Sequence, residues 1–412
     1  MGSIGCLSMH ALDRPCTDEW DRSSLVWYRF DRPCVDSIEL LLLRFACFLP
    51  LLIVLSDSLS LVSKRFRSLL ASPEIYKARS LLGHTETCLY VVFESNPHPL
   101  WYTLCLKPNQ TLTDDTGEKK KKSSGYVLAR VPIPSSPHVR FPGLVAVGYN
   151  IYSIEEEPYY GKKEERSSSD VWILDCRTHT WCEAPSLPVK LLSLSASFLD
   201  GKIYVAGNSY SSGSLKNTIE VFDIKTQIWD TESIPLSETE YNSNNSRSTC
   251  IDGKFHVMKT ITKGVAYNSK ESSWDLIGRE MGDFLFHGSY CKIENVMYSL
   301  TFNGVLKWYD TEVSLWRCLK GLVGLPNFPK YGVYLRLANY GGKMVVLWEV
   351  KIENDPYDLR HDGCGYKKIW CAVIALERRQ KGREISGTVE WVKNVLTVPK
   401  SCYLVKVLDV TV

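Results

Sequence analysis

The 412-residue sequence lacks an excess of charge of either sign. Its 49 lysines and arginines nearly balance its 46 aspartates and glutamates, which leaves a formal net charge of +3. A chain with so little net charge gives no electrostatic reason to expect nucleic acid as a partner. Charge alone therefore points to no class of nucleic-acid-binding protein.

The sequence also lacks an ordered cysteine pattern. Its 14 cysteines are scattered from Cys6 to Cys402, without a CxxC pair or regular spacing. Disulfide-rich secreted domains are shorter and denser in cysteine than this chain. We expect most of the cysteines to be reduced and buried, where each acts as a small apolar side chain. We expect the protein to be located in the cytoplasm, the nucleus or both.

The sequence shows no secretory or membrane-spanning segment. Residues 1–36 lack a basic start followed by an apolar block, and we expect this N-terminal segment to be poorly ordered. The longest apolar run, Leu40–Leu55, has sixteen residues and contains Arg44 and Pro50. A helix needs about 20 apolar residues to cross a bilayer, so we predict a pair of buried helices and no membrane partner.

A short amphipathic helix is predicted directly after this run. Basic residues at 64, 65 and 67 occupy one face, and Ser72–Glu74 has the residues of a new helix start. The other face carries apolar residues at three- and four-residue spacing, namely Leu59, Val62, Phe66, Leu69 and Leu70. We therefore predict a small helical module over residues 37–82.

Strand and turn patterns replace the helical pattern from about Cys88 onward. Short apolar runs are broken every few residues by Gly, Asn, Asp or Ser, which is typical of strands and tight turns. Residues 109–125 are polar and without periodicity, which indicates a loop between two strands. We therefore predict a second domain, mainly β, over residues 84–412.

A motif with Asp or Asn six residues before Trp occurs four times in this domain. Each copy follows an apolar strand, which predicts a hairpin whose Asp or Asn bonds turn amides and whose Trp packs against a neighbouring sheet. The pairs are Asp175 and Trp181, Asp223 and Trp229, Asn268 and Trp274, and Asp310 and Trp316. The intervals between these tryptophans are 48, 45 and 42 residues. We expect Trp391 to be their counterpart in a longer fifth unit.

A second hairpin precedes the Asp–Trp hairpin in each unit. Asp-Gly at residues 200–201 and 252–253 fits a two-residue turn. Two hairpins make four strands, and four strands in about 42–50 residues is typical of a propeller blade. The last strand, residues 401–410, would close the ring by pairing with the first strand after Cys88. Five repeats and one shared blade predict a β-propeller of about six blades.

These features resemble the plant F-box proteins that carry kelch repeats. The stretch "LSLVSKRFRSLLASPEIYKARSLLG" (59–83) is similar to the second half of their F-box, and "DGKIYVAG", "VWILDCRTHTW" and "EVFDIKTQIW" are similar to their kelch units. The first half of the F-box diverges, because "DSIELLLLRFACFLPLLIVL" keeps the leucines without the usual Leu-Pro opening.

The resemblance implies a substrate-recognition subunit of a Skp-cullin-F-box ubiquitin ligase. The F-box-like module would bind a Skp-type adaptor, and through it a cullin-RING ligase, while the kelch-type propeller would bind a target protein. The five apolar residues Leu59, Val62, Phe66, Leu69 and Leu70 would divide between the module's core and the adaptor interface. A simpler alternative is that they only pack the helices onto the propeller.

No catalytic or metal site is apparent in the sequence. The eight histidines do not cluster, and His361, Asp362 and Cys364 lack a second pair of ligands. We predict no cofactor and no catalysis. Two alternatives remain open at this point: a propeller scaffold whose F-box has decayed, and an oxidoreductase related to the copper radical oxidases, which would need Tyr, Cys and His at the centre of the ring.

Overall fold

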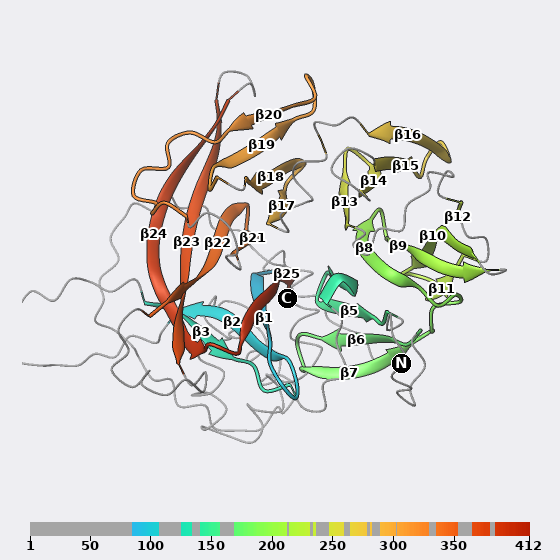
Figure 1. The fold of residues 1–412 in the computed structure, drawn as a ribbon, viewed down its shortest axis with the longest axis horizontal. Coiled ribbons are helices and arrows are strands. Elements are labelled where there is room, and N and C mark those ends of the chain that lie inside the picture. Colours follow the sequence, from blue (N-terminus) through green and yellow to red (C-terminus); the bar gives the residue numbers. More distant parts are fainter. Residues whose placement is uncertain are drawn as a thin grey trace, which may run out of the picture. The chain divides into compact units, whose positions relative to one another are not determined.

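A computed structural model describes most of the predicted β domain (Figure 1). The described residues are 85–106, 125–133, 141–156, 169–211, 214–230, 234–235, 247–258, 264–277, 281, 289–301, 303–328, 335–352, 365–379 and 384–412. All of them belong to one unit of the chain, Phe45–Val412. The predicted N-terminal segment (1–36), the helical module (37–82) and nearly all of the loop at 109–125 lie outside the described residues.

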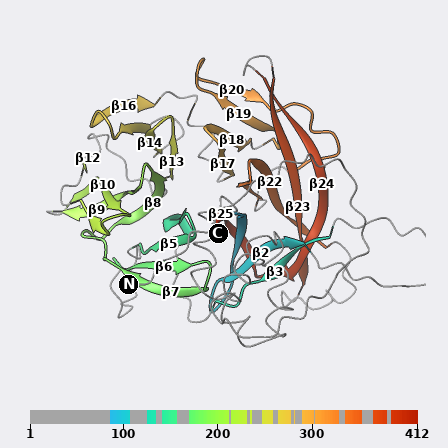
Figure 2. The same cartoon turned by 180° about the vertical axis from the view of Figure 1, so that it is seen from behind.

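Six antiparallel sheets follow one another around a ring (Figures 1 and 2). We number them blades 1 to 6, each from its inner to its outer strand. Blade 1 consists of β25 (Tyr403–Thr411), β1 (Thr87–Glu94), β2 (Leu100–Leu106) and β3 (Tyr126–Arg130). Blade 2 consists of β4 (Leu144–Val147), β5 (Asn150–Ile154), β6 (Val171–Asp175) and β7 (Thr180–Ala184). Blade 3 consists of β8 (Leu192–Leu199), β9 (Lys202–Ser211), β10 (Ser214–Asp223) and β11 (Ile228–Trp229), with β12 (Ile234–Pro235) also paired to β10.

The other three blades repeat the same order. Blade 4 consists of β13 (Arg247–Ile251), β14 (Lys254–Met258), β15 (Gly264–Asn268) and β16 (Ser273–Ile277). Blade 5 consists of β17 (Tyr290–Ile293), β18 (Val296–Leu300), β19 (Leu306–Asp310) and β20 (Leu315–Cys318). Blade 6 consists of β21 (Leu335–Tyr340), β22 (Lys343–Lys351), β23 (Tyr366–Arg379) and β24 (Glu384–Pro399). The prediction of a mainly β, six-bladed propeller is confirmed.

Helical structure is scarce in the described part of the chain. Its one named helical element is a short 3-10 turn, η1 (Phe141–Gly143). Within these described stretches, no helix has the length and apolar character needed to span a bilayer. The apolar run Leu40–Leu55 lies outside them, so the predicted helix pair there stays a prediction.

The ring is closed by pairing the end of the chain with its first described strand. Strand β25 lies antiparallel to β1 in a register that runs from Thr87 opposite Thr411 to Glu94 opposite Tyr403. Leu404 and Val410 of β25 are fully buried. Pairing in this way covers the edge that β1 would otherwise expose, and the predicted closure is confirmed.

Tight turns join the first and second strands of blades 3 and 4. The backbone angle φ is 47° at Asp200 and 81° at Gly201, and 52° at Asp252 and 69° at Gly253. Positive φ at both central residues is the signature of a type I′ turn, whose twist matches that of the flanking strands. Both predicted Asp-Gly turns are therefore present.

The four Asp/Asn–Trp motifs form hairpins of one register between the third and fourth strands of blades 2 to 5. In each, Trp lies opposite the residue that precedes the Asp or Asn. The pairs are Trp181 with Leu174, Trp229 with Phe222, Trp274 with Tyr267, and Trp316 with Tyr309. The Asp or Asn oxygen accepts a hydrogen bond from a turn amide two residues later, at 2.9–3.2 Å.

The hydrophobic core lies between neighbouring blades and not within any one of them. The buried apolar side chains of the described residues form six clusters, one for each pair of adjacent blades. Trp181, Trp229, Trp274 and Trp316 each belong to, or pack against, the cluster that their blade shares with the preceding blade. The outer hairpins therefore stabilise the contacts between sheets.

Trp391 lies differently from the other four tryptophans. The register between β23 and β24 shifts between the pairs Val373–Trp391 and Ile374–Val389, so Glu390 is an extra residue in the outer strand. A bulge of this kind reverses the alternation of faces. As a result Val389 packs between blades 5 and 6, whereas Trp391 packs between blades 6 and 1. There it stacks on Tyr126, with ring centroids 4.8 Å apart.

Candidate functional site

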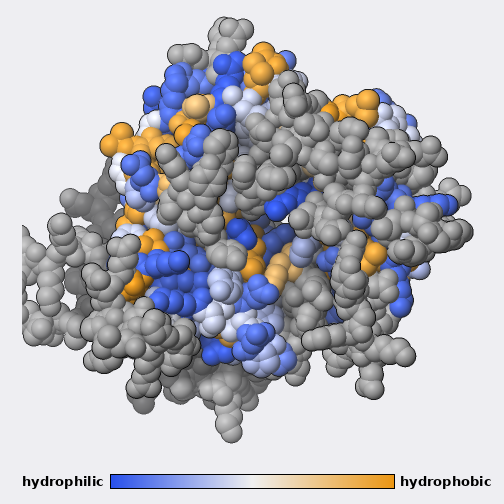
Figure 3. Space-filling view, in the orientation of Figure 1, coloured by the Kyte–Doolittle hydropathy of each residue, from blue (hydrophilic) through white to orange (hydrophobic). Residues whose placement is uncertain are grey.

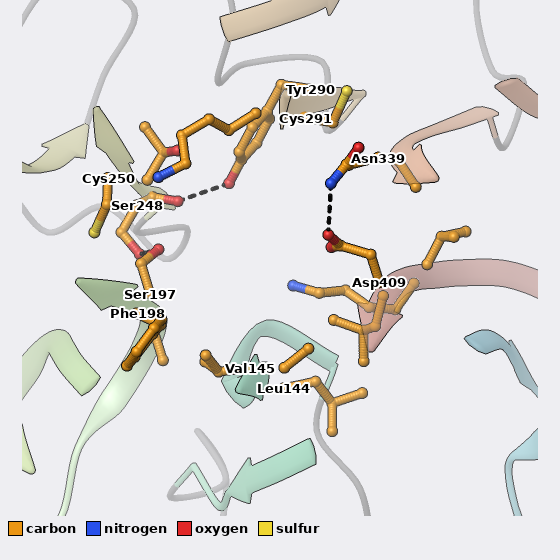
Figure 4. Close-up of a pocket in the computed structure, with 18 of the residues that line it drawn as sticks. Leu144, Val145, Ser197, Phe198, Ser248, Cys250, Tyr290, Cys291, Asn339 and Asp409 are labelled. Atoms are coloured by element: carbon orange, nitrogen blue, oxygen red, sulfur yellow. Dashed lines mark hydrogen bonds between the residues drawn. The ribbon is translucent and has the colours of Figure 1, made fainter. Parts of the chain in front are cut away.

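The inner strands of all six blades surround a central channel. The channel has a volume of about 1040 Å³ and is lined by residues of β4, β8, β13, β17, β21 and β25. Figure 4 shows labelled side chains from each of these strands around one open centre, from Leu144 on β4 to Asp409 on β25. A volume of this size is at the upper limit of small-molecule pockets. The channel is therefore our candidate functional site.

Hydrogen bonds near the channel join every pair of neighbouring blades. We call this set of contacts the channel belt. It consists of Thr411 N to Gly148 O (2.9 Å, blades 1 and 2), Ser193 N to Glu156 Oε1 (2.5 Å, blades 2 and 3), the Ser195 and Ser248 hydroxyls (2.9 Å, blades 3 and 4), Tyr290 Oη to Ser248 O (2.9 Å, blades 4 and 5), Ser289 Oγ to Leu335 O (2.6 Å, blades 5 and 6) and Arg336 Nε to Val405 O (2.8 Å, blades 6 and 1). The belt links adjacent blades, and four of its side chains, Ser195, Ser248, Tyr290 and Arg336, line the channel.

The channel lining carries six charged residues. Four are basic (Arg247, Lys292, Arg336 and Lys406) and two are acidic (Glu294 and Asp409). Asn339 donates a hydrogen bond of 3.0 Å to Asp409 (Figure 4). Burial raises the pKa of Asp409, and the Asn339 hydrogen bond and the Lys292 charge oppose this rise. The lining is thus polar and, taken together, positively charged.

The surface around the ring has a mixed character. Figure 3 shows scattered hydrophobic residues among hydrophilic ones on the described part of the face seen in Figure 1. Single exposed apolar residues such as Leu276 and Val323, which are 82% and 88% exposed, are ordinary on a protein surface. The channel therefore remains the better-defined candidate on this unit.

The Tyr, Cys and His set that a radical oxidase would require does not converge on the channel. Tyr290, Cys250 and Cys291 line it, but no histidine is among its described lining residues. Within the described stretches, no three His, Cys, Asp or Glu side chains are grouped as ligands for a metal. The ring centre therefore offers polar and cationic groups in place of a ligand set.

Tyr90, Cys176 and His179 do meet, but between blades 1 and 2. The Tyr90 hydroxyl donates a hydrogen bond of 3.0 Å to the Cys176 carbonyl and lies 3.0 Å from His179 Nε2. Burial raises the pKa of the Cys176 thiol and lowers the pKa of His179. The Tyr90 phenol donates its proton to a backbone carbonyl, and the Cys176 thiol stays neutral. Both groups therefore contribute to packing between the blades, and we assign this cluster a structural role.

The residues singled out from the sequence fall into two groups. Leu59, Val62, Phe66, Leu69 and Leu70, expected at the adaptor interface, lie outside the described residues. The Asp/Asn and Trp residues lie in the outer hairpins, away from the channel lining.

Sequence reasoning missed the charged residues of the channel. Lys406 and Asp409 interrupt the otherwise apolar strand "YLVKVLDVT", and Arg336 interrupts "LRLANY". Both faces of an inner strand pack against neighbouring blades, so a charged side chain there can reach solvent mainly through the channel. Charged residues within the inner strands were therefore the available signal for the channel lining.

Repeated four-stranded blades, closed by the C-terminal strand around a polar channel, define this protein as a β-propeller of the kelch type. Residues 101–396 match the family model described as FKB95, Kelch-repeats domain. F-box/kelch-repeat protein At5g51250 of Arabidopsis thaliana is 54% identical over 358 residues, which cover 85% of this chain and 93% of that protein. The chain belongs to the plant F-box/kelch-repeat family, as its sequence resemblance predicted.

Two further relatives from Arabidopsis thaliana agree with this assignment. Putative F-box/kelch-repeat protein At5g38680 is 50% identical over 363 residues, covering 86% of this chain and 89% of that protein. F-box/kelch-repeat protein At4g39550 is 46% identical over 365 residues, covering 86% and 88%. Among solved structures, "Structure of YjhT" aligns with a TM-score of 0.37 and 12% identity, over 63% of this chain and 87% of that one, and we draw no argument from it.

Proposed function

We propose that this protein is the substrate receptor of a Skp-cullin-F-box ubiquitin ligase. The observation that carries the proposal is the 54% identity, over 358 residues, to a protein named for an F-box and kelch repeats together. The names of the three relatives reported above mention no enzymatic activity. We propose a role in binding, without catalysis or a cofactor, and we propose that the protein acts in the cytoplasm, the nucleus or both.

The proposal divides the chain into two working parts. Residues 37–82 form the F-box-like module, and its apolar face contacts a Skp-type adaptor. This face consists of Leu59, Val62, Phe66, Leu69 and Leu70. Residues 84–412 form the propeller, which holds the target protein. A closed ring of blades suits this role, because it keeps its loops on a rigid scaffold where they are free to vary in sequence.

Co-purification with a plant Skp-type subunit tests the proposal. We expect the intact chain to bring this subunit down, and Phe66→Asp or Leu69→Asp to abolish its recovery, because a carboxylate on the apolar face cannot be buried without a large cost. Leu276→Asp is the matched control: Leu276 lies on β16 of the propeller and is 82% exposed. We expect this variant to bind as the parent does.

Two results would argue against the proposal. Equal recovery of the Skp-type subunit by the parent and by both Asp variants would remove these residues from the adaptor interface. Failure of the intact, folded chain to bind any Skp-type subunit would favour the alternative, a propeller scaffold whose divergent F-box no longer joins a ligase.

A further inference from the structure

Three of the four basic residues of the channel converge at one level. Arg336 precedes Asn339 by three residues on β21, as Lys406 precedes Asp409 by three on β25. Asn339 donates to Asp409 and Arg336 donates to the Val405 carbonyl, so the two inner strands run side by side in the same direction. Arg336 and Lys406 therefore lie at one level, about 10 Å along the strands from Asp409.

Arg247, the first residue of β13, joins them at this level. It lies five residues before the turn residue Asp252, and Arg336 lies five residues before the turn residue Gly341. The charges of Arg336 and Arg247 both act on Lys406. We call Arg247, Arg336 and Lys406 the basic cluster. The two acidic residues of the lining belong to the other end of the inner strands, where the turns begin.

Two members of the basic cluster carry a charge that no described residue neutralises. Across the described residues, neither Lys406 nor Arg247 has a side-chain hydrogen bond or ion pair. Burial, followed by the charges of Arg336 and Arg247, lowers the pKa of Lys406 to about 8. Lys406 is half-buried, because the surrounding strands shield it from most of the bulk solvent. Like charges placed together, as those of Lys406 and Arg247 are, cost energy unless an anion balances them.

We propose that the channel is a binding site for a small oxyanion, a phosphate or a carboxylate, held by the basic cluster. The Arg247 guanidinium presents paired N–H donors that match both kinds of oxyanion, and Lys406 adds an ammonium group from β25. Arg336 contributes its positive charge, since its Nε and Nη1 already donate to the Val405 and Leu335 carbonyls, each at 2.8 Å. The channel volume of about 1040 Å³ leaves room for an organic molecule that carries the anionic group. The site is independent of the proposed ubiquitin-ligase role.

Titration of the purified full-length chain tests the site. Inorganic phosphate, pyrophosphate and citrate are titrated separately by calorimetry at constant ionic strength, with chloride as the reference anion. We expect saturable binding of at least one of the three, and the pattern among them distinguishes phosphoryl from carboxylate recognition. Lys406→Met keeps the shape of the side chain without its charge, and we expect it to weaken binding at least about tenfold.

Two further variants sharpen the test. Lys225→Met removes a lysine from the exposed outer turn of blade 3, and we expect this variant to bind the anions as the parent does. Asp409→Asn removes a carboxylate from the channel and should tighten binding, because it raises the positive potential there. The site would be supported if Lys406→Met weakens anion binding, Asp409→Asn strengthens it, and Lys225→Met leaves it unchanged.

Other outcomes would overturn the proposal. These are no saturable binding of any of the three anions, or equal binding by the parent and Lys406→Met. We also expect Lys406→Met to raise the midpoint of thermal unfolding without anion, because the buried like charge is gone. If Lys406→Met fails to fold, Arg247→Met gives the same test of affinity, with the same outcome counting against the site.

Discussion

At the scale of single residues, one buried ion pair links the last blade to the closing strand. Lys367 Nζ lies 2.7 Å from Glu349 Oε2, and the two side chains are 5% and 10% exposed. The other Glu349 oxygen accepts a hydrogen bond of 2.7 Å from the Leu404 amide on β25. Glu349 on β22 therefore contacts β23 and β25 at once, and its loss removes the carboxylate beside Lys367 and the acceptor of the Leu404 amide.

We expect Glu349→Ala to lower the free energy of unfolding by about 3–5 kcal/mol, because it removes the carboxylate that pairs with the buried Lys367 ammonium. The control is Glu390→Ala, since Glu390 pairs with Lys343 at the surface, where the side chains are 34% and 44% exposed. An exposed pair contributes only about 0–1 kcal/mol. Urea denaturation of both variants measures the difference. Equal losses would show that burial is not what makes the Glu349 pair important.

His256 predicts a dependence of stability on pH. Both of its ring nitrogens are buried, and they have no hydrogen-bond partner among the described residues. Burial lowers the pKa of His256 to about 4 from its ordinary value of 6.5. The nearby Ile251 backbone and the charges of Asp252 and Asp275 raise this pKa, and the charge of Lys254 lowers it, but burial outweighs them. The folded protein thus holds the imidazole neutral where the unfolded chain protonates it.

We expect the folded state to lose stability as the pH falls from 6.5 toward 4, since only the unfolded chain takes up the proton in that window. At pH 5 the loss from His256 is about 2 kcal/mol relative to pH 7.5. Urea unfolding of the parent and of His256→Leu at both pH values separates the contribution of His256 from that of other titrating groups. The same pH dependence in both proteins would contradict the assignment.

At the scale of elements, the outer hairpins share a residue in left-handed conformation. The residue four positions after the Asp or Asn has positive φ in all four motifs: His179 at 55°, Gln227 at 59°, Ser272 at 50° and Ser314 at 55°. None of the four is glycine, although glycine adopts this conformation most readily. Each hairpin therefore carries a small strain that a substitution should relieve.

We expect Ser314→Gly to raise the free energy of unfolding by about 0.5–1 kcal/mol, because relief of the left-handed strain outweighs the added freedom of the unfolded chain. Val313→Gly, one residue earlier and without positive φ, should lower stability by about 0.5–1 kcal/mol. Thermal unfolding of the two variants shows whether each substitution raises or lowers the stability. A loss of stability in Ser314→Gly would show that the serine makes a contribution beyond its backbone.

At the scale of the whole molecule, stability depends on closing the ring. All eight residues of β1 are opposite a residue of β25, and the clusters on both sides of blade 1 include residues of β25. An open edge at β1 would present unpaired backbone groups and invite association with other chains.

We expect a chain ending at Ser401 to be insoluble or to elute as aggregates in size-exclusion chromatography, because it lacks all of β25. A chain ending at Val410 keeps the pairs from Tyr403 to Val410, so it should remain monomeric, with a lower unfolding midpoint. A monomeric, cooperatively unfolding protein ending at Ser401 would contradict the view that β25 is needed for closure.

Much of this architecture was predictable because it is local or periodic. The Asp-Gly turns depend on two adjacent residues, and the number of blades follows from the spacing of similar hairpins. Trp391 was less predictable, since the bulge at Glu390, which directs it to the other face of its blade, has no marked sequence signal. The basic cluster was missed because Arg247, Arg336 and Lys406 come from strands that are remote in the chain, and a charge within one strand does not show which other charges it meets.

By itself, the sequence determined the family, the repeating four-stranded unit and the strand that closes the ring, because each of these depends on a pattern readable along the chain. The tertiary structure alone decided which side chains meet across blades. Closure of six sheets brings together inner strands that are remote in sequence, and only then do Arg247, Arg336 and Lys406 share one channel. The role of a charged residue in an inner strand therefore depends on which residues the closed ring places around it, and the linear sequence does not show these.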